Sequence, residues 1–238
     1  MKSEPVEYRR GDRIFRGILV DDPARTGSRP GVLVVHEAWG ISEHVKQRAC
    51  RLAEMGYVAF VADMFGEGRQ AASTQEGLGW TKALRGDLNE MRARIRLAFD
   101  VLASRAEVDA SRIAGIGYCF GGSSVLELAR SGAPVAGVVS FHGGLNTPTP
   151  EDAARIKGKV LALHGADDPY VPPAEVAAFE AEMRKANVDW QLVGYGGAVH
   201  SFTMKEAGND NSKGAAYNEK ADQRSWDAMN VFFAEIFK

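Results

Sequence analysis

The chain has 238 residues, of which 29 are Lys or Arg and 31 are Asp or Glu, so its formal net charge is −2. Nucleic-acid-binding domains normally carry a basic excess, so this near balance argues against a nucleic-acid partner. Two cysteines are too few for a disulfide framework or a four-thiolate metal site. No stretch approaches 18 consecutive apolar residues and no secretory signal opens the chain, so no membrane span and a cytoplasmic location are expected.

In chain order, the hydrophobic pattern predicts an amino-terminal β-hairpin followed by strands that alternate with helices. The hairpin spans residues 6–20, with its turn at Gly11 and Asp12. The predicted strands follow at 31–36, 57–62, 112–117, 135–140, 159–164 and 190–195. The predicted helices lie at 43–55, 81–104, 120–130, 173–186 and 216–237.

This alternation is typical of crossover units, and it predicts an α/β fold with a doubly wound, mostly parallel sheet covered by helices on both faces. No linker rich in Pro, Gly or Ser divides the chain, so a single domain over residues 1–238 is predicted. The longest irregular stretches, 63–80 and 201–215, exceed a simple connection and are candidates for pocket walls.

Cys119 lies on the turn between a predicted strand and a predicted helix. Residues Gly117 to Gly121 read G-x-C-x-G, the thiol form of the G-x-S-x-G nucleophile turn. Small flanking residues let strand and helix approach closely, and the helix N-terminus favours an anion, so the pattern indicates a nucleophilic thiol. The alternative is a small buried hydrophobe, which is the expected role of Cys50 within its predicted helix.

The sequence contains no motif for a cofactor or a metal ion. Phe120 stands where a dinucleotide-binding loop requires its third glycine, and a phosphate-binding loop would need Lys before Ser123. His36 and Glu37 begin a zinc-like pattern, but Gly40 occupies the position of the second histidine. Neither a cofactor nor a metal is therefore predicted.

A thiol nucleophile needs a general base, and the base needs an orienting acceptor. His200 lies in the glycine-rich loop after strand 190–195, and Asp167 and Asp168 follow strand 159–164. The order nucleophile, acid, histidine suits enzymes built on such a turn, but the residues alone leave both aspartates open. His44 is expected to be solvated on a helix. His36, His142 and His164 are expected to be structural residues at strand ends.

Four motifs in this order resemble the dienelactone hydrolase family, whose enzymes have the α/β-hydrolase fold. They are Val35-His36-Glu37-Ala38-Trp39-Gly40, Gly117-Tyr118-Cys119-Phe120-Gly121-Gly122, His164-Gly165-x-x-Asp168-x-x-Val171-Pro172 and Gly197-x-x-His200-Ser201-Phe202. The resemblance implies a triad of Cys119, Asp168 and His200. It also implies that Glu37 takes the thiol proton, and that the backbone N–H groups of Phe120 and Ala38 form the oxyanion hole.

The chain departs from this family where two arginines bind a substrate carboxylate. Met204 occupies one of these positions, and Arg69 is the only arginine in the variable stretch that would supply the other. Loss of such charge-assisted anchors disfavours a strongly anionic substrate. Apolar side chains are instead expected to line the substrate pocket, namely Trp39, Phe65, Trp80, Tyr118, Phe202 and Met204.

Together these features predict a hydrolase that cleaves carboxylic ester or lactone bonds through a Cys-His-Asp triad and an acyl-enzyme intermediate. The expected partner is a small-molecule ester or lactone. A hypothesis from another class is a non-catalytic ligand-binding or redox-sensing module on the same fold, in which Cys119 contacts a ligand without turnover.

Overall fold

The computed structural model describes all 238 residues and divides into two compact units, Met1–Ile116 and Gly117–Lys238. The boundary lies inside strand β5, which spans Val108–Tyr118 and begins four residues before its predicted start at 112. No linker separates the two units, since their boundary falls within one strand. The single domain over residues 1–238 therefore stays a prediction. The two units are described in turn.

The first unit joins the amino-terminal hairpin to parallel strands. The hairpin of β1 (Lys2–Arg10) and β2 (Arg13–Asp21) is confirmed, with Gly11 in its turn at a φ of 58°. Strand β2 runs antiparallel to β4 (Val58–Ala62), and β4 runs parallel to β3 (Arg29–Val35). Every residue of β4 is buried, as its continuous apolar run predicts.

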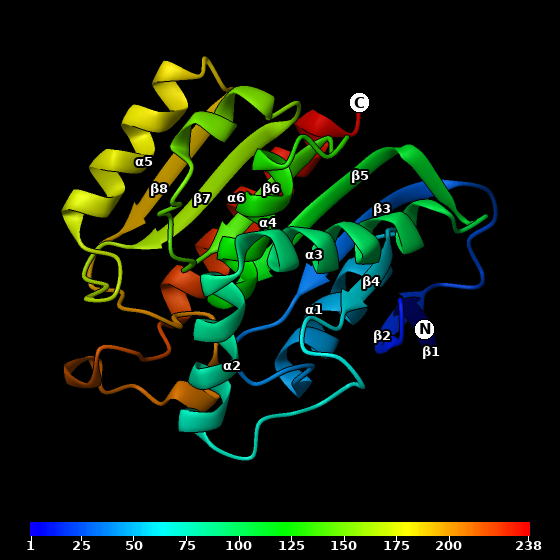
Figure 1. Ribbon diagram of the computed structural model, residues 1–238, viewed down its shortest axis with the longest axis horizontal. Coiled ribbons are helices and arrows are strands. Elements are labelled where there is room, and N and C mark those ends of the chain that lie inside the picture. Colours follow the sequence, from blue (N-terminus) through cyan, green and yellow to red (C-terminus); the bar gives the residue numbers. More distant parts are fainter. The chain divides into compact units, whose positions relative to one another are not determined.

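The predicted helix over 81–104 is wrong, because the structure has two helices there. Helix α2 spans Thr74–Gly86 and helix α3 spans Leu88–Ala103, and Figure 1 shows them as separate helices with different directions. The helical conformation is interrupted at Asp87, whose side chain accepts a 3.0 Å hydrogen bond from the Glu90 N–H and so caps α3. The stretch 63–80 is predicted to be irregular, but only its residues before α2 are; the rest belong to this helix.

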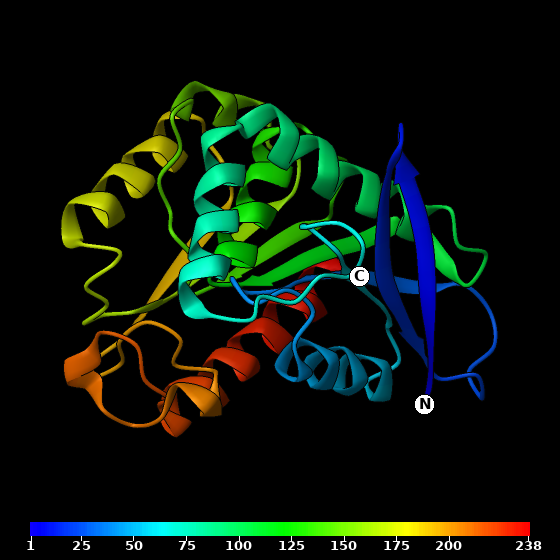
Figure 2. The same cartoon turned by 60° about the horizontal axis from the view of Figure 1, so that its bottom comes forward.

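Helix α1, Glu43–Glu54, matches its predicted span to within one residue and packs against β4, β3 and β2. Its buried side chains recur at helical spacing and include two that are polar, His44 and Arg48. Figure 2 shows α1 and the long hairpin strands of the same unit from another side. A polar pair on the inner face of a helix needs internal hydrogen-bond partners, which the first unit supplies.

The second unit has three parallel strands in the order β6-β7-β8. These strands span Gly137–Phe141, Lys159–Gly165 and Trp190–Tyr195. Its helices are α4, α5 and α6, at Phe120–Arg130, Pro173–Lys185 and Glu219–Ile236. The last helix starts later than predicted because Asn218 caps it, accepting a 3.1 Å hydrogen bond from the Ala221 N–H.

Helices cover both faces of β6. A Cβ at Gly137 would lie 2.8 Å from the Phe232 ring of α6, whereas a Cβ at Gly122 of α4 would lie 2.6 Å from the Ser140 hydroxyl. Residues 137 and 140 point to opposite faces of the strand because side chains alternate. The doubly wound arrangement predicted from the sequence is therefore present around this strand.

A buried arginine of helix α4 is hydrogen-bonded to helix α5. Arg130 donates to both carboxylate oxygens of Glu182, at 2.7 and 2.8 Å, and to Glu127 at 2.9 Å. It also donates to the backbone carbonyl of Leu145 at 2.9 Å. With so many partners the charge is satisfied in the interior, and α4 is held where its N-terminus carries Cys119.

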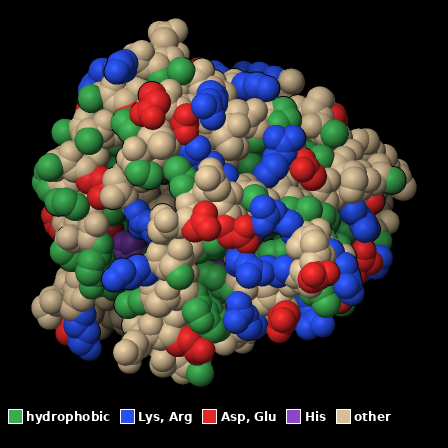
Figure 3. Space-filling view, in the orientation of Figure 1, with side chains coloured by type: hydrophobic (Ala, Val, Ile, Leu, Met, Phe, Trp, Pro, Cys, Tyr) green, Lys and Arg blue, Asp and Glu red, His purple; other side chains and the backbone are tan.

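Charged side chains of both signs are interspersed on the face drawn in Figure 3, with no broad area of one sign. This agrees with the small net charge of −2. None of the helices combines the length and the apolar character that crossing a membrane would require.

Candidate active site

Cys119 occupies the predicted strand-to-helix turn in the second unit. Its φ of 55° and ψ of −114° are strained for a residue with a side chain, as expected at a nucleophile turn. Its N–H donates to the Phe141 carbonyl at 3.0 Å, and its carbonyl accepts from the Ser123 N–H at 3.2 Å. Backbone hydrogen bonds on both sides thus hold the half-buried thiol at the N-terminus of α4.

The glycines around Cys119 have a packing reason. A Cβ at Gly117 would collide with the backbone of Gly121 and would lie 2.7 Å from the Gly122 nitrogen. A Cβ at Gly122 would lie 2.8 Å from the Gly143 Cα. Strand and helix therefore meet closely here because these positions lack side chains, as the G-x-C-x-G pattern predicts.

The structure distinguishes the two adjacent aspartates. Asp168 Oδ2 lies 2.7 Å from His200 Nδ1, and its other oxygen accepts from the Tyr170 N–H at 2.8 Å. Asp167 turns elsewhere and accepts from the Gly197 N–H at 2.9 Å. Only Asp168 is thus placed to orient His200.

The charge of the Cys119 side chain also acts on His200, so the second unit brings the three predicted triad residues near one another. Burial lowers the pKa of His200, but the charge of Cys119 and the hydrogen bond to Asp168 outweigh it and raise the pKa to about 10. The backbone of His200 donates to the Gly214 carbonyl at 3.2 Å and accepts from the Ala216 N–H at 3.0 Å. These two bonds fix the loop that carries the imidazole.

Two aromatic rings flank His200, and the sequence pointed to neither as part of the site. The Tyr170 ring lies edge-on to the imidazole at 5.3 Å between centroids, and the His142 ring lies at the same distance. His142 is buried and its Nε2 lies 2.8 Å from the Thr203 hydroxyl. Tyr170 could have been predicted as a site residue from the sequence, because it lies in the turn that follows Asp168.

Glu37 lies in the first unit, directly after β3, with only 1% of its surface exposed. Its Oε1 lies 2.5 Å from Nδ1 of His44, and its Oε2 accepts from the Ser42 hydroxyl at 3.3 Å. The expectation that His44 is solvated is therefore wrong. His44 faces inward because the buried carboxylate of Glu37 needs a hydrogen-bond donor there.

His36, at the end of β3, is a satisfied structural residue, as predicted. Its Nδ1 lies 2.6 Å from the Glu37 carbonyl, and its Nε2 accepts from the Met64 N–H at 3.2 Å. Burial lowers the pKa of His36 and so favours the neutral imidazole. Burial also lowers the pKa of His164, at the end of β7.

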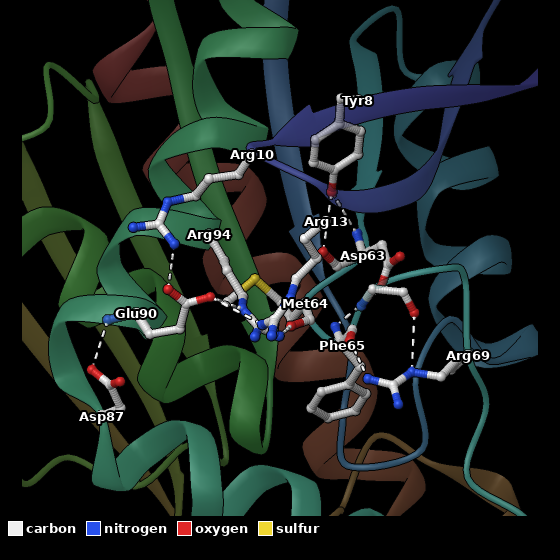
Figure 4. Close-up of polar contacts among 11 residues, drawn as sticks. Tyr8, Arg10, Arg13, Asp63, Met64, Phe65, Arg69, Asp87, Glu90 and Arg94 are labelled. Atoms are coloured by element: carbon white, nitrogen blue, oxygen red, sulfur yellow. Dashed lines mark hydrogen bonds and ion pairs between the residues drawn. The ribbon is translucent and has the colours of Figure 1, made fainter.

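Two of the predicted pocket residues, Phe65 and Trp80, line a cavity of about 590 Å³ in the first unit. Arg69 lines it too, with its guanidinium 5.0 Å from the Trp80 ring. Figure 4 shows that this guanidinium turns to backbone carbonyls, to which it donates at 2.5 Å (Phe65) and 3.3 Å (Gly66). Three further arginines of this wall, Arg10, Arg13 and Arg94, converge on one carboxylate, Glu90.

The remaining predicted pocket residues divide by burial. Tyr118 is fully buried and stacks on Phe141 at 4.7 Å between centroids. Phe202 is fully buried too, packed edge-on against His142 at 5.1 Å. Trp39 and Met204 are half-buried and remain candidates for contact with a substrate. No three side chains of His, Cys, Asp or Glu converge as a metal site would require.

Comparison with known proteins places this chain among hydrolases. The profile of the dienelactone hydrolase family matches residues 15–237. A protein of Saccharolobus solfataricus, provisionally named a carboxymethylenebutenolidase, is 26% identical over 87% of this chain and 90% of its own length. The solved structure of m3DLH is 44% identical, covers 100% of this chain and 99% of its own, and superposes with a TM-score of 0.96.

Two further solved structures extend the comparison. The dienelactone hydrolase-like promiscuous phosphotriesterase P91 from metagenomic libraries is 41% identical, with a TM-score of 0.93 over 99% of this chain and 98% of its own. Est1E from Butyrivibrio proteoclasticus is 15% identical, with a TM-score of 0.70 over 98% of both chains, a likeness of fold alone. These neighbours confirm the predicted α/β-hydrolase fold.

Proposed function

The chain belongs to the dienelactone hydrolase family and is a hydrolase, and from this premise we propose that it cleaves carboxylic ester or lactone bonds by acyl transfer to Cys119. Family membership supports the ester or lactone chemistry. The single observation that best supports the assignment of residues is the 2.7 Å contact between His200 Nδ1 and Asp168 Oδ2, together with the electrostatic influence of Cys119 on the same imidazole. Nucleophile, proton carrier and orienting acceptor are thereby connected in that order.

In the proposed acylation step the Cys119 thiolate attacks the carbonyl carbon, and a carbon–sulfur bond forms. The protonated imidazole of His200 beside it favours the thiolate over the less nucleophilic thiol. The carbonyl electrons move onto oxygen, and the family resemblance assigns its hydrogen-bond donors to the backbone N–H groups of Phe120 and Ala38. Loss of one such donor typically costs about 3–4 kcal/mol of transition-state stabilisation.

The leaving group then departs with a proton from His200. Acylation removes the thiolate charge, which is the first of the causes that raise the pKa of His200. The pKa therefore falls and the proton passes to the leaving alkoxide. Neutral His200 next removes a proton from water, which attacks the thioester, while Asp168 holds the imidazole in the required tautomer. The carbon–sulfur bond then breaks, the carboxylic acid leaves, and the Cys119 thiolate forms again beside the protonated imidazole.

Glu37 is proposed to take the thiol proton when Cys119 is protonated. The S–H bond breaks, an O–H bond forms on the carboxylate, and the thiolate remains. This role comes from the family resemblance, and the deep burial of Glu37 supports it, because a buried carboxylate is held in one orientation by its hydrogen bonds. A carboxylate exposed at the rim would lack this restraint.

A second candidate substrate class is a neutral phosphotriester. The observation that favours it is the 41% identity, over 99% of this chain, to the promiscuous phosphotriesterase P91. An uncharged phosphotriester requires no cationic anchor, which agrees with Met204 at the position of a family arginine. The same thiolate would attack phosphorus in place of carbon: a sulfur–phosphorus bond forms, the bond from phosphorus to one ester oxygen breaks, and that alkoxide leaves with the proton of His200.

The experiment is turnover of 4-nitrophenyl acetate, dihydrocoumarin and paraoxon by the wild type and by the Cys119→Ala and Cys50→Ala variants. We expect Cys119→Ala to abolish turnover and Cys50→Ala to retain it, with both variants folded by circular dichroism. Full activity in Cys119→Ala would refute the mechanism. Saturable binding of the same compounds without turnover by the wild type would instead support the ligand-binding module.

A second measurement is alkylation by iodoacetamide at pH 6, followed by peptide mass spectrometry. An ordinary thiol is mostly protonated and slow to react at this pH. We expect Cys119 to be alkylated well before Cys50, because the protonated His200 stabilises a thiolate at residue 119. Equal, slow labelling of both cysteines would count against an activated thiol.

A further inference from the structure

We propose that His44 is a positioning residue for Glu37, and that Arg48 fixes the tautomer in which His44 acts. This proposal rests on the proposed proton-accepting role of Glu37. Its basis is a chain of hydrogen bonds in the first unit, from Arg48 Nε to His44 Nε2 at 3.2 Å and from His44 Nδ1 to Glu37 Oε1 at 2.5 Å. The sequence alone predicts a solvated His44.

All three side chains of this chain are removed from water. Glu37 is 1% exposed, His44 8% and Arg48 6%. Burial of a carboxylate is unfavourable unless hydrogen bonds replace its hydration, so the partners of Glu37 decide where its oxygens lie. Those partners are His44 at Oε1 and the longer contact of Ser42 at Oε2, 3.3 Å.

The tautomer of His44 follows from the chemistry of Arg48. A guanidinium carries donors and no acceptor, so an Nε–H of Arg48 that points at His44 Nε2 requires that nitrogen to accept. The imidazole proton then resides on Nδ1, where it is donated to Glu37. His44 is thereby neutral, and it orients the carboxylate without bringing a full positive charge beside it.

This arrangement also indicates which oxygen of Glu37 accepts a proton. His44 already donates to Oε1 at 2.5 Å, and a protonated Oε1 would point a second hydrogen at the same bond. Oε2 has only the hydroxyl of Ser42, which rotates and can accept as well as donate. We therefore assign the incoming proton to Oε2, with Oε1 as the fixed end of the carboxylate.

Helix α1 explains why this set forms. His44 and Arg48 are one helical turn apart, so they lie on the same face of the helix. Ser42 precedes the first turn of α1, and Glu37 lies in the connection that leads from β3 to it. A short connection thus brings one helix face onto the carboxylate, and the contact stays within the first unit.

The test compares Glu37→Gln, His44→Leu and His44→Asn, with Gln47→Ala on the exposed side of α1 as the matched control. Leucine keeps bulk but has no donor, whereas the amide of asparagine places an N–H close to the position of Nδ1. We expect His44→Leu to lower kcat on 4-nitrophenyl acetate about tenfold or more, the scale of one lost charge-assisted hydrogen bond. KM should change little, His44→Asn should recover to within about threefold of the wild type, and Gln47→Ala should be unaffected.

The outcomes separate this inference from the proposed function. If Glu37→Gln keeps full activity, the proposed role of Glu37 is wrong. If Glu37→Gln loses activity but His44→Leu does not, the positioning role of His44 is overturned. Equal losses in His44→Leu and His44→Asn, both with wild-type melting temperatures, would also overturn it.

A measurement on the wild type covers the case in which the variants fail to fold. Nitrogen-15 NMR of histidine-labelled protein reports which imidazole nitrogen carries the proton. We expect the His44 signals to show a protonated Nδ1 and an unprotonated Nε2 at neutral pH. A protonated Nε2 would overturn the assignment, whatever the behaviour of the variants.

Discussion

Nδ1 of His200 and Oδ2 of Asp168 lie 2.7 Å apart, and the carboxylate side chain is completely buried whereas 13% of the imidazole side chain is exposed. A buried acceptor behind a partly exposed ring leaves the opposite edge of the ring for the reacting atoms. The second oxygen of Asp168 is held by the Tyr170 N–H at 2.8 Å, so the carboxylate has little freedom to rotate. The relationship therefore fixes the orientation of His200.

Asp168→Asn is expected to keep the fold and lose most of the activity. The amide can offer an N–H to Nδ1, which stabilises the tautomer that cannot take a proton from the reacting side, and such a change costs about 10⁴-fold in kcat in a serine protease triad. Asp167→Asn is the matched control, because that carboxylate caps the Gly197 N–H and does not contact His200. The kcat values of the two variants are compared by steady-state kinetics on one ester. Equal activity of both variants would contradict the assignment of Asp168.

The raised pKa of His200 gives a prediction for stability against pH. Folding raises this pKa from 6.5 to about 10, so the folded state holds the proton more tightly than the unfolded chain. The resulting stabilisation is complete below pH 6.5 and is lost as the pH rises through about 10. We expect the free energy of unfolding of the wild type to be lower at pH 10 than at pH 7, with a smaller difference in His200→Gln.

The same histidine can be followed directly by NMR titration. We expect the imidazole of His200 to stay protonated at neutral pH in the wild type. In Cys119→Ala its pKa should be lower, because the charge at residue 119 is the largest contribution that raises it. An unchanged titration in the alanine variant would show that Asp168 alone holds the proton.

Tyr170 is expected to restrict the motion of His200 through its ring. The ring is edge-on to the imidazole at 5.3 Å, although 60% of the residue is exposed. Tyr170→Phe keeps that contact and removes the hydroxyl, which lies 3.4 Å from the Lys213 carbonyl, so kcat should stay within about twofold of the wild type. Tyr170→Ala should lower kcat about fivefold, the scale of an aromatic pair contact. If Tyr170→Ala matches the phenylalanine variant, the ring contact has no role in turnover.

Much of the fold could be predicted because the signals are local. Continuous apolar runs gave the buried strands, and the small residues around Cys119 gave the turn, since both patterns reflect packing next to the residue itself. The predicted single helix over 81–104 is wrong although the sequence carries a local signal for two helices: Gly86 ends the first, and Asp87 caps the second. Element boundaries depend on such single side chains.

The parts of the site that could not be predicted depend on contacts between distant segments. Asp167 and Asp168 are neighbours in sequence, and only the position of His200, some thirty residues later, separates their roles. His44 looked like a surface residue because its helix was considered without the carboxylate of Glu37, which a preceding strand supplies. Hydrophobic periodicity reports which face of a helix is buried, but it does not report a buried polar partner.

The glycines of the nucleophile turn give the last prediction, which concerns stability. In Gly117→Ala the new Cβ would collide with the backbone of Gly121 and lie 2.7 Å from the Gly122 nitrogen, and backbone atoms of a helix cannot move aside as a flexible side chain can. Overpacking of this kind typically costs about 1–3 kcal/mol, and the free energy of unfolding should fall by at least about 2 kcal/mol. Activity should fall as well, because the displaced turn carries Cys119.

Gly79→Ala in helix α2 is the matched control, since a Cβ there meets no atom within 4 Å. Alanine in a helix interior is favoured over glycine by about 0.5–1 kcal/mol, so this variant should be slightly more stable than the wild type. Urea unfolding followed by circular dichroism compares the two variants under one set of conditions. A Gly117→Ala variant as stable as Gly79→Ala would show that strand and helix can separate without cost, and that close packing does not fix the position of the thiol.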